Sequence, residues 1–218
     1  MRRDLVVIAV ALAAFAALTA ALAAGGPLIE LDLAVRAWSE AHRPPAADRI
    51  ARVANRLGQG GALLGLSVLA AAVAARRGRT LRPLLYVATA ALLLVPTVLA
   101  IKAVTERGAP SSPLPPERTV ALLGPLPAGE YDAGFPSGHV VNTVVWYGVL
   151  LTLATVLLRG YGRAAPPRTL WWTVRVAPVV IVLFTSTYLS FHWLSDGLAG
   201  LALGIAIDRT LHLPRWRL

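Results

Sequence analysis

The sequence predicts an all-α integral membrane protein, a six-helix bundle that forms a single domain over residues 1–218. Hydrophobic residues make up 56% of the chain and charged residues only 15%, with a mean hydropathy of +0.64, which is unusual for a soluble domain. Apolar stretches long enough to cross the roughly 30 Å hydrocarbon core of a bilayer recur along the whole chain. The charged residues are concentrated between these stretches.

Each apolar stretch is close to the roughly 17–25 residues that a spanning helix needs. The six expected transmembrane helices cover residues 5–24, 57–75, 84–101, 140–158, 174–189 and 193–211. The first follows Arg2 and Arg3 and ends in small residues, so it also resembles a secretory signal peptide. Because its apolar core is long for a signal peptide, we expect a retained first helix.

Residues 27–56 mix apolar with charged residues at helical spacing, which predicts two amphipathic helices broken at Pro44 and Pro45. We expect these helices to lie in the outer membrane interface after the first transmembrane helix, with Trp38 as an anchor. A short soluble cap is the alternative. Residues 105–135 are rich in proline and glycine and predict a loop. Motif residues at both ends of this loop favour a functional role for it.

The distribution of charge predicts the orientation in the membrane. If the N-terminus is cytoplasmic, the outer segments 25–56 and 102–138 carry eight basic residues (five plus three) and eight acidic residues (four plus four). The inner segments carry two acidic residues, Asp4 and Asp208, against twelve arginines: Arg2, Arg3, Arg76, Arg77, Arg79, Arg82, Arg159, Arg163, Arg168, Arg209, Arg215 and Arg217. The positive-inside rule therefore predicts a multi-pass protein of the cell membrane with both termini in the cytoplasm.

The formal net charge of +10 is then explained by topology and by contact with anionic membrane lipids. A basic stripe interleaved with aromatic residues is absent from the sequence, so we expect no nucleic-acid partner. Cysteine is also absent, which excludes disulfides, thiolate catalysis and cysteine metal sites. We expect no metal and no cofactor. Twenty arginines against one lysine, together with abundant alanine, suggest a GC-rich and hence bacterial genome.

A cluster of polar residues falls at helix ends that this topology places on the outer side. Its members are Lys102, Pro136-Ser137-Gly138-His139, His192 and Asp196. Ionisable residues near a membrane face are costly unless they are paired or solvated, so the cluster predicts a functional site with an extracytoplasmic position. The other two histidines, His42 and His212, fall in interfacial segments, and we expect them to be passive.

The spacing within the cluster suggests a chemistry. His192 and Asp196 are four residues apart, so on one helix the carboxylate can orient one imidazole nitrogen and leave the other free as a nucleophile or base. Ser137 and Gly138 open a helix, whose unpaired N–H groups and positive dipole end form an anion seat. His139 at that end can donate a proton to a leaving oxygen. Each piece alone is more often a cap or a turn, and their joint placement on one face favours a site.

Three motifs follow one another along the chain: Lys102 followed by Ala109-Pro110, then Phe135-Pro-Ser-Gly-His139, then His192 with Asp196 four residues later. The chain resembles the type 2 phosphatidic acid phosphatase superfamily of membrane lipid phosphatases. The resemblance lies in these three motifs, in the six-helix layout and in the long third loop. The resemblance implies that His192 is the nucleophile that forms a phosphohistidine, Asp196 its orienter and His139 the general acid. It also implies that Lys102, Ser137 and the Gly138 N–H cradle the phosphate.

Two arginines of the family pattern are replaced, by Ala109 in the first motif and by Ser186 before the third. Such arginines stabilise the charge that develops in phosphoryl transfer, and losing one donor costs about 10²–10³ in rate. Arg107, two residues before Ala109, is a candidate substrate-binding replacement, and Arg118 lies in the same loop.

The first functional hypothesis is therefore a phosphatase that hydrolyses a lipid-linked phosphate or diphosphate, on a polyprenyl or glycerolipid carrier, at the outer leaflet. The second is a catalytically altered relative that binds or transports a lipid phosphate, or transfers the phosphoryl group to an acceptor other than water. A structural protein with vestigial motifs ranks lower, because it leaves a membrane-embedded aspartate without a role. A vanadate-dependent haloperoxidase needs the missing arginines. The lipid and the oligomeric state are left open by the sequence.

Overall fold

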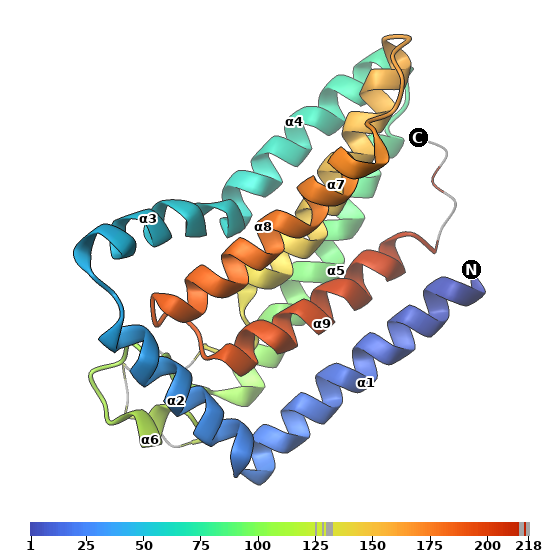
Figure 1. Ribbon diagram of the computed structural model, residues 1–218. Coiled ribbons are helices and arrows are strands. Elements are labelled where there is room, and N and C mark those ends of the chain that lie inside the picture. The colour runs from blue at the N-terminus through green and yellow to red at the C-terminus, as the bar shows by residue number, and fades with distance from the viewer. Residues whose placement is uncertain (125, 128, 130–132, 214–215, 217–218) are drawn as a thin grey trace.

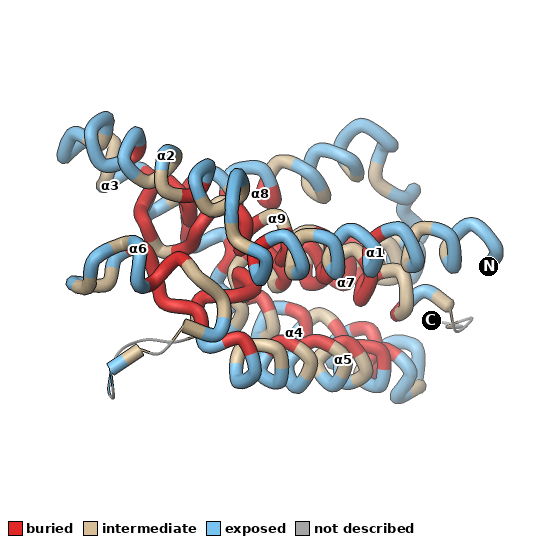
Figure 2. Tube along the Cα trace, turned by 90° about the horizontal axis from the view of Figure 1, so that it is seen from below, coloured by how far each residue is buried: buried red, intermediate tan, exposed pale blue. Residues whose placement is uncertain are grey.

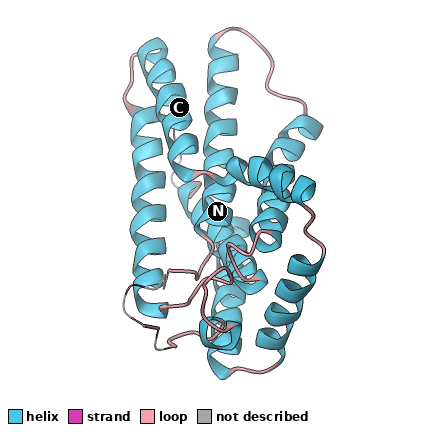
Figure 3. Ribbon diagram, turned by 90° about the vertical axis from the view of Figure 1, so that its left-hand side faces the viewer, coloured by secondary structure: helices cyan, strands magenta, loops and turns pink. Residues whose placement is uncertain are grey.

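The structure, a computed structural model, describes residues 1–124, 126–127, 129, 133–213 and 216. Pro125, Arg215 and Arg217, which the sequence placed in the loop and the cytoplasmic segment, lie outside the described residues. The helices are α1 (Arg2–Ala24), α2 (Pro27–Ala41), α3 (Pro45–Asn55), the 3₁₀ helix η1 (Arg56–Gly58), α4 (Gly60–Gly78), α5 (Arg82–Thr105), α6 (Pro116–Thr119), α7 (Gly138–Gly160), α8 (Arg168–Tyr188) and α9 (Leu194–Leu211). The described part of the chain contains helices and no strand, so the all-α prediction is confirmed (Figure 3).

The long helices run alongside one another in a bundle (Figure 1). The N-terminus and the α4–α5 and α7–α8 connections lie at one end, and α2, α6 and the loop around α6 lie at the other (Figure 1). Helix α7 is the central element, because it contacts α4, α5, α8 and α9, while α1 packs along α9. Buried positions gather along α7 and at the end of the bundle near α6 (Figure 2).

Five helices are long and apolar enough to cross a membrane, namely α1, α4, α5, α7 and α8. The sixth predicted helix, α9, has 18 residues and carries Asp196, Asp208 and Arg209, which lowers its hydropathy. It nevertheless belongs to the bundle, where it packs against both α1 and α7. The count of six transmembrane helices therefore stays a prediction.

The chain after α1 forms two helices, α2 and α3, divided before Pro45 as the sequence predicts. Proline suits the first turn of a helix because its missing N–H would have no partner there. Trp38 is 51% exposed on α2, but a position of these helices at a membrane interface stays a prediction. The long loop differs from expectation in one respect, since it contains the four-residue helix α6.

Helices α7 and α9 approach closely at two glycines of α9. A Cβ atom on Gly200 would lie 2.7 Å from the Ser137 carbonyl oxygen, and one on Gly204 would lie 2.9 Å from the Val144 Cβ. Both distances are shorter than side chains tolerate, so these positions need the smallest residue. Small residues at helix interfaces let backbones approach in membrane bundles. The α7–α9 contact matters for function because Ser137 and Asp196 stand at the starts of these two helices.

We predict that Gly200→Ala destabilises the protein by about 1–3 kcal/mol, because the carbonyl of Ser137 is backbone and cannot move aside. The matched control is Gly65→Ala on α4, where an added Cβ meets nothing within 4 Å. Thermal unfolding of the detergent-solubilised protein measures both variants. An unchanged midpoint for Gly200→Ala would contradict the close α7–α9 packing.

Candidate active site

Four helix ends meet at the end of the bundle that carries α6. Lys102 lies in the last turn of α5, Ser137 is the N-cap of α7, and Asp196 lies in the first turn of α9. His192 lies in the short connection between α8 and α9. The structure thus brings together the residues that the sequence placed in one cluster.

The two histidines of the cluster share a cavity. Their ring centroids are 6.1 Å apart, and the rings meet edge to face. The cavity has a volume of about 440 Å³. Its lining residues are Ala109, Ser111, Ser112, Pro113, His139, Phe191 and His192.

Asp196 lies behind His192, although His192 precedes α9 and does not share a helix with Asp196. The Nδ1 atom of His192 is 3.6 Å from Asp196 Oδ2, which is ion-pair distance but too long for a hydrogen bond. Nδ1 is buried and has no hydrogen-bond partner among the described residues. A shift of a few tenths of an ångström would form the bond. Since Nδ1 faces Asp196, the Nε2 edge of the ring is the one left for a substrate.

Asp196 also connects the two histidine motifs through the backbone. Its carbonyl oxygen accepts a hydrogen bond from the Ser137 N–H (3.0 Å). Its Oδ2 accepts from the Trp193 N–H (2.9 Å), so the side chain caps the start of α9. The positions of His139 and His192 are therefore coupled through one residue.

A helix starts where the sequence predicts an anion seat, with Ser137 as the N-cap of α7. Ser137 caps the helix by accepting from the Val140 N–H (3.5 Å). A Cβ atom on Gly138 would be 3.9 Å from Lys102 Cε, so the lysine side chain lies beside the first turn of α7. Lys102 Nζ donates to the Ala133 carbonyl, which directs the ammonium group toward the loop. Ser137 itself is fully buried. Its hydroxyl is not among the groups that line the cavity, and its role in phosphate binding stays a prediction.

Arg107 is not among the residues that line the cavity of the two histidines, and its role as a phosphate ligand stays a prediction. Its side chain is fully buried. Its Nε donates to the Val120 carbonyl (2.7 Å), and Nη2 donates to Asp32 Oδ2 (2.7 Å). Its Nη1 donates to Ser195 Oγ (2.8 Å) and to Asp196 Oδ1 (2.5 Å). Because Asp32 and Asp196 both need a cation when buried, they hold the guanidinium away from the cavity.

Asp32 and Ser195 complete this buried cluster, and the sequence did not single them out. Asp32 Oδ1 accepts from the Ser195 N–H (2.9 Å), and Oδ2 accepts from the Ser195 hydroxyl (2.5 Å). The cluster thus brings two carboxyl groups to one guanidinium directly behind His192. Asp32 carries no sequence signal of this role, since it is one of four acids in an amphipathic segment.

Ala109 and Ser186, the two positions where the resemblance expects arginine, have different surroundings. Ala109 lines the cavity directly. Ser186 is buried, and its hydroxyl donates to Asn55 Oδ1 (2.8 Å). The Ser186 carbonyl oxygen accepts from the N–H groups of Phe191 (3.0 Å) and His192 (3.2 Å), so it fixes the turn that carries His192. Arg118 is exposed on α6.

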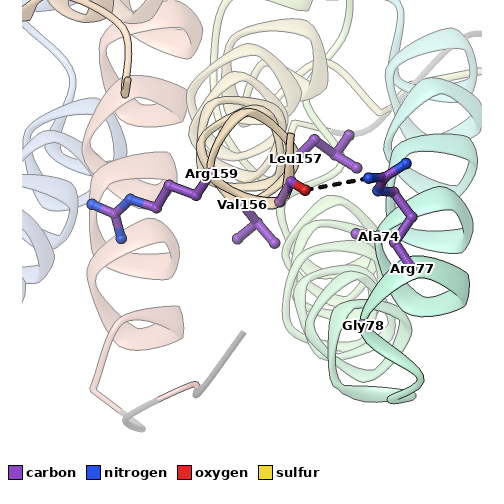
Figure 4. A pocket seen from close by; sticks show the side chains of 7 residues that line it. Ala74, Arg77, Gly78, Val156, Leu157 and Arg159 are labelled. Atoms are coloured by element: carbon purple, nitrogen blue, oxygen red, sulfur yellow. Dashed lines mark hydrogen bonds between the residues drawn. The ribbon is translucent and has the colours of Figure 1, made fainter. Parts of the chain in front are cut away.

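A larger cavity, of about 510 Å³, lies at the opposite end of the bundle between α4 and α7 (Figure 4). It is lined by arginines and apolar residues, and Arg77 donates across it to the Gly160 carbonyl (3.2 Å). None of the motif residues lines it. His42 and His212 also lie outside the site, where each ring bonds a backbone carbonyl of its own helix.

We predict that Arg107→Ala destabilises the protein by about 3–5 kcal/mol, because it leaves two buried carboxylates without their cation. Arg107→Lys should recover only part of the loss, since an ammonium group cannot bridge as a guanidinium does. Thermal unfolding measures both, with Arg118→Ala as the exposed control. A fully stable Arg107→Ala protein with a raised KM would instead restore Arg107 as a phosphate ligand.

The family model of the PAP2 superfamily matches residues 79–217, which is more than half of the chain. A comparison with curated proteins gave no match. Among solved structures, the fold is similar to one described as the crystal structure of the first transmembrane PAP2 type phosphatidylglycerolphosphate phosphatase from Bacillus subtilis. The TM-score is 0.74 at 20% sequence identity, and the match covers 100% of both chains. The family match confirms the resemblance that the motifs indicate: the chain belongs to the PAP2 superfamily.

Proposed function

We propose that the protein is a membrane phosphatase that hydrolyses a lipid-linked phosphate or diphosphate through a phosphohistidine on His192. The observation that carries the proposal is the shared cavity of His139 and His192, with Asp196 behind the second histidine. Nucleophile, orienting carboxylate and general acid are the parts that such a reaction requires. Membership of the PAP2 superfamily supports it.

In the first step, Nε2 of His192 attacks phosphorus and the bond from phosphorus to the leaving oxygen breaks. His139 protonates that oxygen as it departs with the lipid. The Lys102 ammonium and the N-terminal N–H groups of α7 stabilise the equatorial phosphoryl oxygens. Asp196, backed by Asp32 and Arg107, stabilises the positive charge that His192 acquires when it is phosphorylated.

In the second step, a water molecule attacks the phosphohistidine opposite Nε2. His139, now neutral, takes a proton from that water, and the phosphorus–nitrogen bond breaks to release inorganic phosphate. His192 returns to the neutral state with its Nδ1 edge still facing Asp196. All protons and electron pairs are accounted for by the chain, the lipid phosphate and water.

The proposed orientation places the site outside the cytoplasm. The arginine-rich connections α4–α5 and α7–α8 lie at the end of the bundle opposite the histidines (Figure 1). Positive-inside bias then puts those connections in the cytoplasm and the site at the outer leaflet. A lipid carrying an outward-facing phosphate would reach the site from the membrane, with membrane lipids around the bundle.

A second candidate function rests on Ala109 and Ser186. With neither arginine at its family position, the site has fewer cations for a transferred phosphoryl group, which favours a binding or transport protein or a phosphotransferase. Restoring the pattern with Ala109→Arg and Ser186→Arg separates the two functions. A weakened phosphatase gains hydrolysis, whereas a site reshaped for another reaction has no reason to gain it.

We predict that His192→Ala removes phosphate release completely and that His139→Ala lowers it by about 10²–10⁴-fold, because only His192 bonds to phosphorus. The measurement is phosphate release by the purified protein from a panel of lipid mono- and diphosphates. His42→Ala is the matched control, since that ring lies outside the site. Residual turnover in His192→Ala equal to that in His139→Ala would remove the nucleophile assignment.

We predict that a cysteine at Gly78 is protected from an impermeant thiol reagent in intact cells, because Gly78 ends α4 among cytoplasmic arginines. A cysteine at Ser111, which is exposed near the site, should be labelled. The chain has no native cysteine to interfere. Labelling at Gly78 without labelling at Ser111 would invert the proposed orientation.

A further inference from the structure

A second cavity adjoins the proposed active site. It has a volume of about 240 Å³ and shares His139 and Phe191 with the cavity that contains His192. Its remaining lining residues are Arg52, Asn55, Arg56 and Gln59. The proton donor of the proposed reaction thus stands between a compartment that holds the nucleophile and a compartment that holds two arginines.

Helical spacing explains why three of these side chains converge. Residues 52, 55 and 56 follow the pattern i, i+3 and i+4, which is one face of a helix. Arg52 and Asn55 lie on α3 and Arg56 begins η1, while Gln59 follows in extended backbone just before α4. Helix α3 packs against α8, and Asn55 is buried in that contact. The arginine-bearing face is therefore held beside His139.

This cavity lies where the family pattern would place one of its arginines. Ser186 stands at that position, and its hydroxyl bonds to Asn55, which lines the cavity. A long side chain at residue 186 would extend toward the same space. Arg52 and Arg56, which lie outside the three motifs, thus supply positive charge near Ser186, where the third motif lacks its arginine.

The two arginines differ in how their charge is used. Arg52 donates two hydrogen bonds to Asp48 (2.6 and 3.1 Å), and these bonds lower the pKa of the Asp48 carboxyl below its usual value. The Asp48 charge therefore offsets that of Arg52. Arg56 is exposed, and its side chain has no hydrogen bond or ion pair within the part of the chain that the structure describes. Arg56 is the cation that this cavity offers to an anion.

We propose that Arg56, assisted by Arg52, binds a phosphate group of the lipid substrate beside His139 and so replaces in space the arginine absent at Ser186. The proposal rests on the proposed function, because it assumes a lipid phosphate at this site. Guanidinium groups bind phosphate oxygens through paired hydrogen bonds. The phosphate held there is either the group transferred to His192 or the second phosphate of a diphosphate, and both present the same oxygens to Arg56.

The test compares Arg56→Gln with Arg49→Gln, which removes an exposed arginine of the same helix that lines neither cavity. Each variant is assayed on a prenyl monophosphate and on the diphosphate of the same chain length. We expect Arg56→Gln to lower kcat/KM by about 10²-fold and Arg49→Gln to leave it unchanged. Loss on both substrates shows that Arg56 holds the transferred group, and loss on the diphosphate alone shows that it holds the second phosphate. Equal rates for Arg56→Gln and Arg49→Gln overturn the proposal.

A rescue experiment tests the spatial replacement. Ser186→Arg is introduced into Arg56→Gln, and we expect it to recover at least part of the lost kcat/KM, because the new guanidinium reaches the same cavity. Arg56→Lys should recover less than wild-type activity, since an ammonium group lacks the paired donors. Failure of Ser186→Arg to rescue, in a protein whose thermal midpoint is unchanged, contradicts the shared position.

Binding of orthovanadate separates this proposal from the proposed function. Titration calorimetry of the His192→Ala protein, which cannot turn over, measures anion affinity without hydrolysis. We expect the affinity of His192→Ala to fall about tenfold or more when Arg56→Gln is added and to stay constant when Arg49→Gln is added. If the wild type releases no phosphate from any lipid but this difference holds, the phosphatase function fails and the anion site stands. If neither substitution changes vanadate affinity, the anion site fails.

Discussion

The buried bridge from Asp32 through Arg107 to Asp196 is the interaction on which the site depends. It joins α2, the long loop and the start of α9 through side chains with no solvent exposure. Removing a charge from such a bridge leaves the others unpaired, so all three segments must keep their places. The Asp196 side chain then faces Nδ1 of His192 at 3.6 Å, and its carbonyl accepts a hydrogen bond from the Ser137 N–H. The Arg107 guanidinium thus supports the residue, Asp196, that lies next to both histidine motifs.

Arginine side chains have two different roles in this structure. Arg107 contributes its charge to the interior, where it balances carboxylates, while Arg52 of α3 and Arg56 of η1 line a cavity beside His139. Proximity in sequence to a motif favoured Arg107 as a phosphate ligand, but the sequence did not indicate that Arg107 would pair with Asp32, seventy-five residues away. The residue types that a phosphate site needs are provided by the fold as a whole and not by the three motifs alone.

The sequence predicted much of the fold, because apolar length and proline positions are local properties. The break at Pro44 and Pro45, the long helices and the cap at Ser137 follow from neighbouring residues. The proximity of His192 and Asp196 was predicted, but the predicted reason, a shared helix, does not hold, because His192 precedes α9. Asp32 and Ser195, the Asn55 contact of Ser186 and the α3 face beside His139 were not, because each depends on segments distant in sequence. Helix α9 joins the bundle despite three charged residues, since two of its acids are paired with arginines of other segments.

The most direct test of the account is the identity of the residue that carries phosphate during turnover. The protein reacts briefly with a lipid phosphate labelled in its terminal phosphoryl group, and the reaction is then quenched in alkali, which preserves phosphohistidine. Most other phosphoesters remain distinguishable from phosphohistidine by mass. Peptide mapping then locates the label. The account predicts one phosphoryl group on the imidazole of His192 and none in the His192→Ala protein. A phosphoryl group on His139, or a phosphoenzyme trapped in His192→Ala, would contradict it.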